Sequence, residues 1–406
     1  MKKSLALLMA VLFALSALAA CGGGGTAATT AAATTAATEA TTAAATSSLP
    51  TGTYKIGGTG PLTGGAAIYG MSVKQGAELA VEEINALGGI QFELNYQDDE
   101  HDAEKAVNAY NTLKDWGIQI SFSSVTSTPA VATIADAYRD RLFGLTPSAS
   151  STAVTEGNDN IYQMCFADPN QGMASAQYIY NKQLGEKIAV IYKNDDVYSK
   201  GIYETFEVMA NELGLDIVSV TTFTEDSQSD FSVQIADARN NGADFIFLPM
   251  YYTPASLIFR QADAIGYQPK YFGVDGMDGI LTLEGFDPAL AEGVMLLTPF
   301  SADAQDGLTV NLVEKYQAKY GEIHNQFAAD GYDCVYAVYK AILDSDGKIT
   351  ADMSAAEICE ELIAIFNGDF KFDGVTGSDM TWDPSGQVSK EPKAVIIQNG
   401  EYIGMD

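Results

Sequence analysis

The sequence of 406 residues predicts an α/β fold with two doubly wound parallel-sheet lobes joined by a multi-crossing hinge. From residue 53 onward, short apolar segments typical of buried strands alternate with segments whose apolar residues recur at helical spacing. Strands that are apolar on both faces are typical of parallel sheets covered by helices. The alternation pauses near residues 167–169 and then starts again, which predicts a second sheet.

The first run of elements covers roughly the first third of the folded region. Helices are expected to stop at Gly88-Gly89 and at Gly117, because glycine is the usual residue after a helix end, and Asp102 can cap the second helix. The expected strands are 54–57, 92–96, 118–122 and 142–145, and the expected helices are 73–87, 102–117 and 129–140.

The second run repeats the same rhythm. We expect a continuous helical stretch after it, over residues 309–345, and a late strand at 394–397 that returns to an earlier sheet. The other expected strands are 187–192, 217–220, 245–248 and 271–274, and the other expected helices are 199–212, 230–240 and 254–265.

The N-terminal residues carry the pattern of an export signal. A basic head at 1–3 precedes an apolar run over 5–20 that is too short to span a membrane. The run ends at Cys21 and resembles the lipobox of bacterial lipoproteins, which implies a lipoprotein signal peptide at 1–20 and acylation of Cys21. The alternative is a plain secretory peptide followed by an incidental cysteine. The resemblance predicts a lipid-anchored protein on the extracytoplasmic face of the cell membrane.

Residues 21–50 are expected to form the lipidated cysteine and a disordered Gly/Ala/Thr tether. This segment has too little apolar bulk to offset the entropy of ordering itself, although a short helix is the alternative. A random coil of the length of 22–48 reaches roughly 30 Å.

The formal net charge is −31, from 22 basic and 53 acidic residues. This charge excludes nucleic acid as a partner, since phosphate binding depends on Lys and Arg. With four arginines in the whole chain, a guanidinium clamp on a phosphorylated ligand is also disfavoured.

Cysteine and histidine patterns predict no metal, no cofactor and no catalytic residue. Cys165, Cys334 and Cys359 are an odd number, so at least one is free, and their apolar neighbours favour buried small hydrophobes. His101 and His324 lie far apart in the chain with no cysteine pair beside them, and no GxSxG motif occurs. The chain is therefore expected not to be an enzyme.

Hydroxyl-rich loops follow three strands of the first run. In open parallel sheets, ligands bind beyond the carboxyl ends of the strands, so the loops at 58–70, 123–129 and 146–151 are candidate ligand contacts. Each precedes a helix and offers hydroxyl groups together with free backbone N–H groups, which suits a carboxylate. Ordinary helix capping is the alternative for each loop.

The loops of the second run carry carboxylates and tyrosines instead, at 194–198, 250–253 and 273–278. Asp275 could balance an ammonium group while aromatic rings enclose a side chain. The alternative for Asp275, which is flanked closely by glycines, is a turn former. One lobe suits an anion and the other a cation, which fits an α-amino acid.

The sequence resembles type I periplasmic binding proteins, specifically the leucine/isoleucine/valine-binding group of ABC importers, over the whole chain from about Tyr54. Each matching stretch alone is weak, but the ordered set is specific. The matching stretches are 60–64, 69–70, 75–80, 84–90, 96–99, 123–124, 146–149, 196–201, 251–262, 273–276 and 382–383.

The resemblance implies roles for residues of the first lobe. Ser124, Ser148 and Ser150 would bind the carboxylate or ammonium group of the ligand, and Tyr69 would form a wall of the pocket. Phe327 matches a further aromatic wall residue.

In the second lobe, the resemblance implies that Tyr198, Tyr251 and Asp275 close over the ligand, with Asp275 as the counter-charge to the ammonium group. Asp275 stands where a glutamate is common, and its shorter reach leaves the identity of the amino acid open. Some family members have a disulfide where this chain has His101 and Ser123, so that disulfide is not expected.

The resemblance also implies the domain division and the function. Lobe 1 is expected over 52–167 with 300–380, and lobe 2 over 168–299 with 381–406. The implied protein is a monomeric extracytoplasmic solute-binding component of an ABC importer, which captures a branched-chain or similar amino acid by hinge closure and delivers it to permease subunits in the membrane. The alternative is an extracellular domain that senses amino acids or amides.

Overall fold

The computed structural model describes residues 50–300, 306–322 and 324–405. The predicted signal peptide at 1–20, Cys21 and all of the predicted tether except Pro50 lie outside the described residues.

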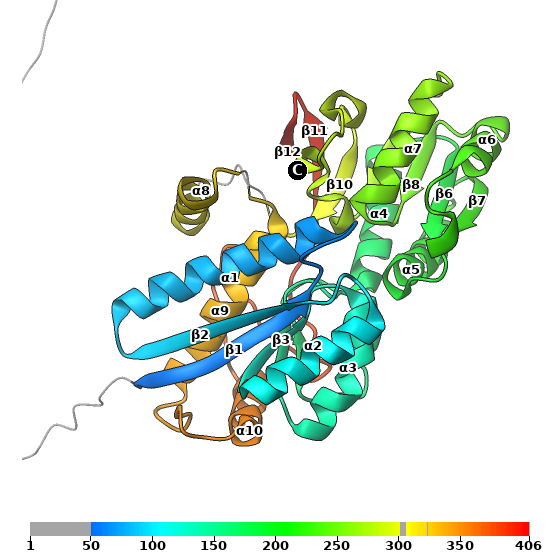
Figure 1. Cartoon of the computed structure of the whole chain (residues 1–406). Coiled ribbons are helices and arrows are strands. Elements are labelled where there is room, and N and C mark those ends of the chain that lie inside the picture. Colours follow the sequence, from blue (N-terminus) through cyan, green and yellow to red (C-terminus); the bar gives the residue numbers. More distant parts are fainter. Residues whose placement is uncertain (1–49, 301–305, 323, 406) are drawn as a thin grey trace, which may run out of the picture. The chain divides into compact units, whose positions relative to one another are not determined.

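The first sheet is parallel throughout and has the strand order β2-β1-β3-β4-β5 among the described residues (Figure 1). The chain therefore runs outward from β1 to β2 and then back past β1 to β3, which creates a topological switch point between β1 and β3. The strands are β1 (Gly52–Gly60), β2 (Ile90–Asp98), β3 (Ile120–Ser124), β4 (Gly144–Thr146) and β5 (Ile161–Gln163).

Helices pack against this sheet in two pairs, α1 on α9 and α2 on α3 (Figure 1). The β1–α1–β2 and β2–α2–β3 connections run in opposite directions along the sheet, so right-handed crossovers place α1 and α2 on opposite faces. α10 contacts α9 and β3. These helices are α1 (Ala67–Leu87), α2 (Ala103–Trp116), α3 (Ser127–Asp140), α9 (Gln326–Asp344) and α10 (Ala355–Phe366).

The second sheet has the order β12-β11-β10-β9-β8-β6-β7. Its parallel part, β7-β6-β8-β9-β10, repeats the order of the first sheet and has its own switch point between β6 and β8. The strands are β6 (Ile188–Lys193), β7 (Ile217–Phe223), β8 (Phe245–Leu248), β9 (Lys270–Gly273), β10 (Met295–Thr298), β11 (Lys393–Gln398) and β12 (Glu401–Gly404).

The edge of the second sheet adds an antiparallel hairpin to the predicted parallel strands. β11 and β12 form an antiparallel hairpin, and β11 pairs antiparallel with β10. The turn is Asn399-Gly400, with φ of 54° and 78°, and Asn-Gly is a strong hairpin signal that the sequence analysis did not use.

The helices and short 3₁₀ turns of the second run connect its strands. The helices are α4 (Asp168–Lys182), α5 (Val197–Leu213), α6 (Ser232–Asn240) and α7 (Tyr252–Ala264). The 3₁₀ turns are η1 (Thr152–Val154), η2 (Glu225–Ser227), η3 (Asp275–Met277), η4 (Ile280–Thr282) and η5 (Pro288–Ala291), of which η1 belongs to the first run. The sequence analysis did not predict β5, α4, β10, α10 or β12.

The predicted continuous helix over 309–345 is wrong. The structure has two helices, α8 (Gly307–Tyr320) and α9. Gly321 ends α8 in a left-handed conformation with φ of 73°, and the side chain of Asn325 caps α9 by accepting a hydrogen bond from the Ala328 N–H.

The third strand lies later in the chain than predicted, at β3 instead of 118–122. Ser123 and Ser124 are therefore in the strand, and only Val125 and Thr126 connect it to α3. Ser123 has a positive φ of 51°, and the pairing of β1 with β3 shifts register between Gly57 and Thr59. No periodic pattern of apolar residues in the sequence predicts this irregularity of the strand.

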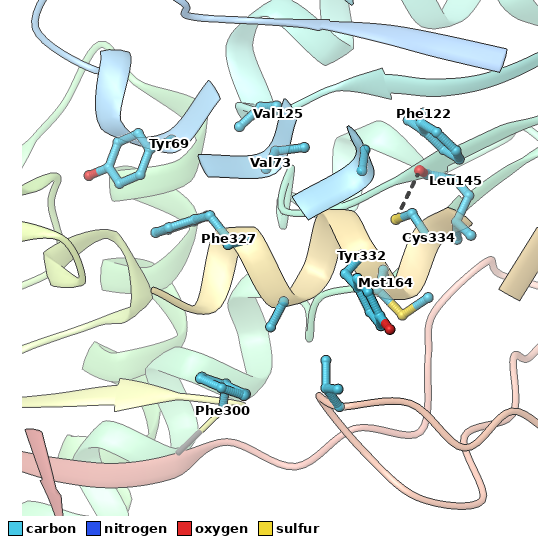
Figure 2. Packing of buried hydrophobic residues seen from close by; sticks show 14 of the residues in the cluster. Tyr69, Val73, Phe122, Val125, Leu145, Met164, Phe300, Phe327, Tyr332 and Cys334 are labelled. Carbon is cyan, nitrogen blue, oxygen red and sulfur yellow. Dashed lines mark hydrogen bonds between the residues drawn. The ribbon is translucent and has the colours of Figure 1, made fainter. Parts of the chain in front are cut away.

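The buried cysteines behave as small hydrophobes, as predicted. Cys165, Cys334 and Cys359 are free and buried. Figure 2 shows Cys334 of α9 beside Phe122 and Leu145, where its thiol donates a hydrogen bond to the Leu145 carbonyl at 3.6 Å. Burial raises the pKa of the Cys334 thiol, so the group stays protonated.

The chain passes between the two sheets after β5, after β10 and before β11. α8 through α10 thus follow a strand of the second sheet, although α8 and α9 contact α1 of the first. The exact lobe boundaries assigned from the sequence remain a prediction.

The close approach of α1 and α9 depends on glycine. A Cβ atom at Gly76 would lie 1.9 Å from the carbonyl oxygen of Ala328. Gly76→Ala is therefore expected to lower the free energy of unfolding by about 1–3 kcal/mol, because the helices must separate to relieve the overlap. Denaturant unfolding monitored by circular dichroism measures this change.

Gly307→Ala is the matched control, because Gly307 is also helical and a Cβ atom there would meet nothing within 4 Å. Its unfolding free energy is expected to stay within about 0.5 kcal/mol of the parent. Equal effects of the two substitutions would contradict the proposed overlap.

Candidate ligand-binding site

One cavity lies where the switch points of both sheets supply residues. The loop after β3 contributes Val125 and Thr126, the segment after β6 contributes Tyr198, and the segment after β8 contributes Tyr251. All of these follow the carboxyl ends of strands, where doubly wound sheets bind ligands. The other lining residues are Tyr69, Ser148, Asp275, Gly276 and Phe327.

The free space between these side chains is about 10 Å³, which holds roughly one water molecule. In this arrangement the aromatic rings fill the site, so a solute larger than water requires the rings or the two sheets to move apart.

The charged group of the cavity is Asp275, the first residue of η3 after β9. The hydroxyl of Tyr198 donates a 2.5 Å hydrogen bond to Oδ1 of Asp275 and accepts one of 2.9 Å from the Gly276 N–H. The Asp275 N–H in turn donates to Oε1 of Gln171 at 3.1 Å. The carboxylate is thus fixed in place by neutral groups.

Burial and, to a smaller extent, the neighbouring carboxylate of Asp278 raise the pKa of Asp275 to about 6. The hydrogen bond from the Tyr198 hydroxyl acts in the opposite direction and lowers the pKa. The described residues that line the cavity include no Lys or Arg, so the site offers a negative charge without a cationic partner.

Aromatic rings form the walls. Tyr198 stacks on Tyr251 with ring centroids 4.7 Å apart and an interplanar angle of 2°. Tyr69 packs against Phe327 at 4.6 Å and against Tyr251 at 5.3 Å. Figure 2 shows Tyr69 of α1 and Phe327 of α9 beside each other.

Hydrogen bonds join the loops of the two sheets around the cavity. The Tyr69 hydroxyl donates to the Gly276 carbonyl at 2.5 Å and accepts from the Tyr252 N–H at 3.2 Å. The Thr128 hydroxyl donates to Oδ1 of Asp196 at 3.0 Å. Contacts of this kind must break if the sheets separate.

The lining of the cavity also includes hydroxyl groups and the residue at the N-terminus of α3. Thr126 is the N-cap residue of α3, and its hydroxyl lies 2.9 Å from Nδ1 of His101. Burial lowers the pKa of His101, which favours the neutral imidazole. The first N–H groups of α3 and the positive end of its dipole favour an anion here.

The structure brings together six of the eight predicted ligand residues, namely Tyr69, Ser148, Tyr198, Tyr251, Asp275 and Phe327. Ser124 does not line the cavity, because its buried hydroxyl donates to Oδ2 of Asp99 at 2.6 Å. Ser150 does not line it either, although its buried hydroxyl has no hydrogen-bond partner among the described residues. The hydroxyl of Ser148 donates to the Val125 carbonyl at 2.6 Å. Ligand contact by all eight residues remains a prediction.

Sequence reasoning missed Asp168 and Gln171 at the start of α4. Both carboxylate oxygens of Asp168 and Nε2 of Gln171 are buried without a hydrogen-bond partner among the described residues. Burial raises the pKa of Asp168 well above its usual value, and the charges of Asp275 and Asp196 raise it further. The sequence feature that could have indicated this site is Asp168 next to a proline, at the point where the alternation of strands and helices begins again.

Among the described residues, no group of three or more His, Cys, Asp and Glu side chains is placed to hold a metal ion. No described helix is long and apolar enough to cross a membrane.

Two doubly wound sheets whose switch points share one cavity define the class of solute-binding α/β proteins. The chain belongs to the periplasmic binding protein family, whose model matches residues 53–390. Members of this family bind solutes and are not enzymes. The family and the fold class predicted from the sequence are thus confirmed.

Three similar proteins illustrate the relationship. The Leu/Ile/Val-binding protein homolog 3 of Brucella melitensis is 31% identical over 226 residues, which cover 55% of this chain and 61% of that protein. The Leu/Ile/Val-binding protein of Escherichia coli is 26% identical over 339 residues, which cover 82% of this chain and 88% of that protein. A crystal structure of a branched-chain amino acid transporter substrate binding protein from Streptococcus pneumoniae, in complex with isoleucine, has a TM-score of 0.77 and 26% identity, and the match covers 87% of this chain and 100% of that one.

The hydrogen bond from Tyr198 should control the ionisation of Asp275. Tyr198→Phe removes a donor that stabilises the carboxylate, so the pKa of Asp275 is expected to rise from about 6 to about 7. A ¹³C NMR titration of protein labelled at aspartate carboxyl groups measures the change, with Asp275→Asn used to assign the resonance.

Tyr203→Phe is the control, because the Tyr203 hydroxyl donates to Glu207 on the same helix. It should leave the pKa of Asp275 unchanged. A pKa that stays the same in Tyr198→Phe would show that the hydrogen bond does not stabilise the charge.

Proposed function

We propose that the protein is the extracytoplasmic solute-binding component of an ABC importer and captures a branched-chain or similar small amino acid. The names of its relatives support this proposal, since they include Leu/Ile/Val-binding proteins and a substrate binding protein in complex with isoleucine. In this proposal the protein itself performs no chemistry, and a membrane permease receives the solute.

One observation carries the choice of an amino acid. A buried carboxylate, Asp275, and Thr126, the N-cap residue at the start of α3, line the same cavity. A zwitterion satisfies both, because its ammonium group pairs with Asp275 and its carboxylate accepts hydrogen bonds from the α3 N–H groups and nearby hydroxyls.

The aromatic residues favour an apolar side chain on that amino acid. Tyr69, Tyr251 and Phe327 surround the space next to Asp275 with ring faces and edges. Burial of an aliphatic side chain among these rings contributes about 25 cal/mol per Å² of apolar surface removed from water.

Binding should be coupled to motion of the two sheets. The cavity has room for roughly one water, so an amino acid enters only when contacts such as the Tyr69–Gly276 hydrogen bond open. A solute that then contacts residues from both sheets favours their renewed closure, because it gains those contacts only in the closed state.

We also propose that acylation of Cys21 anchors the protein at the extracytoplasmic face of the membrane, close to the permease. The sequence of small residues that ends at Cys21 supports this.

Cys21→Ser is expected to move the protein from the membrane fraction to the soluble fraction after cell lysis, because the acylated residue is lost. Ser16→Ala, in the apolar run, is the control and should leave the fractionation unchanged. Membrane retention of Cys21→Ser would contradict the anchor.

Removal of the negative charge should abolish most amino-acid binding. Asp275→Asn keeps the size of the side chain but leaves a buried ammonium group unpaired, which costs about 2–5 kcal/mol and hence at least about thirtyfold in affinity. Calorimetric titration with leucine, isoleucine and valine measures the loss. Exposed Asp263→Asn is the control and should bind normally.

The same titrations test the charge in the parent protein. The carboxylate must be ionised to pair with ammonium, so affinity is expected to fall about tenfold between pH 7 and pH 5, below the pKa of about 6. Benzoate has a carboxylate and no ammonium group, and it should bind weakly. Tight binding of benzoate, or unchanged leucine affinity in Asp275→Asn, would overturn the assignment.

A further inference from the structure

His101 lies between the two sheets, although it is not among the residues that line the cavity at Asp275. It belongs to the turn between β2 and α2, where its φ of 60° is left-handed and its N–H donates to Oδ1 of Asp99 at 3.0 Å. Nδ1 of its ring lies 2.9 Å from the Thr126 hydroxyl, and the ring packs edge-on against Tyr251 with centroids 5.3 Å apart. Thr126 follows a strand of the first sheet and Tyr251 a strand of the second. The imidazole therefore contacts residues from both sheets.

Two carboxylates near His101 are already engaged in hydrogen bonds with neutral donors. Oδ2 of Asp99, on the same turn, accepts from the Ser124 hydroxyl at 2.6 Å. Oδ1 of Asp196, the N-cap residue of α5, accepts from the Thr128 hydroxyl at 3.0 Å. An imidazolium ion at His101 must compete with these donors for its counter-charge.

The other charged groups that face His101 come from the second sheet. Glu225 of η2 and Lys193 at the end of β6 form an ion pair with each other. Burial is the largest effect and lowers the pKa of His101 below its usual value of 6.5. Asp196, Asp99 and Glu225 act in the opposite direction, whereas the ammonium group of Lys193 adds to the lowering. The imidazole is thus neutral while the sheets are in contact.

Separation of the sheets would move Tyr251, Asp196, Glu225 and Lys193 away from His101 and expose the imidazole to water. Water stabilises the charged form, so the open state binds the proton more tightly than the closed state. Protonation at this residue then opposes closure. The opposition begins as the pH falls below about 6.5 and is complete below the pKa of the closed state.

We propose that His101 couples closure of the two sheets to release of a proton. The coupling depends on the sheet motion proposed for solute capture, but not on which solute is captured.

Asp275 has the opposite sign, and this decides how the coupling must be measured. Burial raises its pKa to about 6, so its protonation favours the closed state. The pH dependence of closure as a whole adds the two effects. The coupling at His101 is therefore measured on His101 itself.

NMR titration of the histidine ring signals tests the proposal. The chain has two histidines, and His101→Gln identifies the His101 signal by its loss. The midpoint of His101 is expected below 6.5 in the parent protein. Tyr69→Phe with Thr253→Val removes two hydroxyls that donate hydrogen bonds from one sheet's elements to the other's, and it leaves the direct contacts of His101 in place. The sheets should separate more often, so the midpoint should rise towards 6.5.

Tyr203→Phe with Thr112→Val is the matched control. It removes the same two kinds of hydroxyl, but Tyr203 donates to Glu207 within α5 and Thr112 donates to the Asn108 carbonyl within α2. The midpoint of His101 should stay at the parent value. Circular dichroism confirms that each variant is folded, and Thr253→Val alone decides the outcome if the double variant does not fold.

A parent midpoint at or above 6.5, or equal midpoints in the two double variants, would overturn the coupling. Small-angle X-ray scattering separates the reasons. A larger radius of gyration in Tyr69→Phe/Thr253→Val without a shift of the midpoint would refute the role of His101 alone. No change in either quantity would also contradict the sheet motion, whereas absence of leucine binding in calorimetry would contradict only the proposed solute.

Discussion

The buried carboxylate of Asp275 is the constraint on which the site depends. Burial opposes its charge, and the nearby carboxylate of Asp278 opposes it too. A neutral donor, the Tyr198 hydroxyl, favours the ionised form. A pKa of about 6 is the result of this balance. The described residues that line the cavity include no positively charged side chain to pair with this carboxylate, so a solute with a cationic group stabilises its ionised form. The charge of the solute is therefore the first requirement for binding, and its shape is the second.

The placement of this carboxylate follows from topology. The first sheet has the strand order β2-β1-β3-β4-β5, and the parallel part of the second sheet has the equivalent order β7-β6-β8-β9-β10. Each order creates one switch point, and the residues after those strands line the same cavity. The two sheets contribute different chemistry to the cavity. The first supplies a helix N-terminus at Thr126, and the second supplies Tyr198 after β6 and Asp275 after β9.

Much of the fold and of the candidate site was predictable from the sequence. Apolar strands and glycine-terminated helices are local signals, so the two-lobed α/β fold followed from them. Asp275 was predicted because it follows a predicted strand and because the family resemblance implies a counter-charge at that position. The engagement of Ser124 with Asp99 was not predictable, since it depends on a tertiary contact and an irregular strand at Ser123. The unpartnered carboxylate of Asp168 was not predictable either, because burial at a crossing between sheets leaves no periodic pattern.

The Tyr69 hydroxyl connects the two sheets at the proposed binding site. It donates to the Gly276 carbonyl and accepts from the Tyr252 N–H, and so joins α1 to the second sheet. A hydrogen bond of this kind contributes about 1 kcal/mol net, which is less than a buried ion pair loses when one partner is removed. A solute that pairs with Asp275 can therefore compensate for breaking this contact on entry. Tyr69 also packs on Phe327, with ring centroids 4.6 Å apart. Displacement of Tyr69 therefore breaks this aromatic contact and the hydrogen bonds between the sheets at the same time.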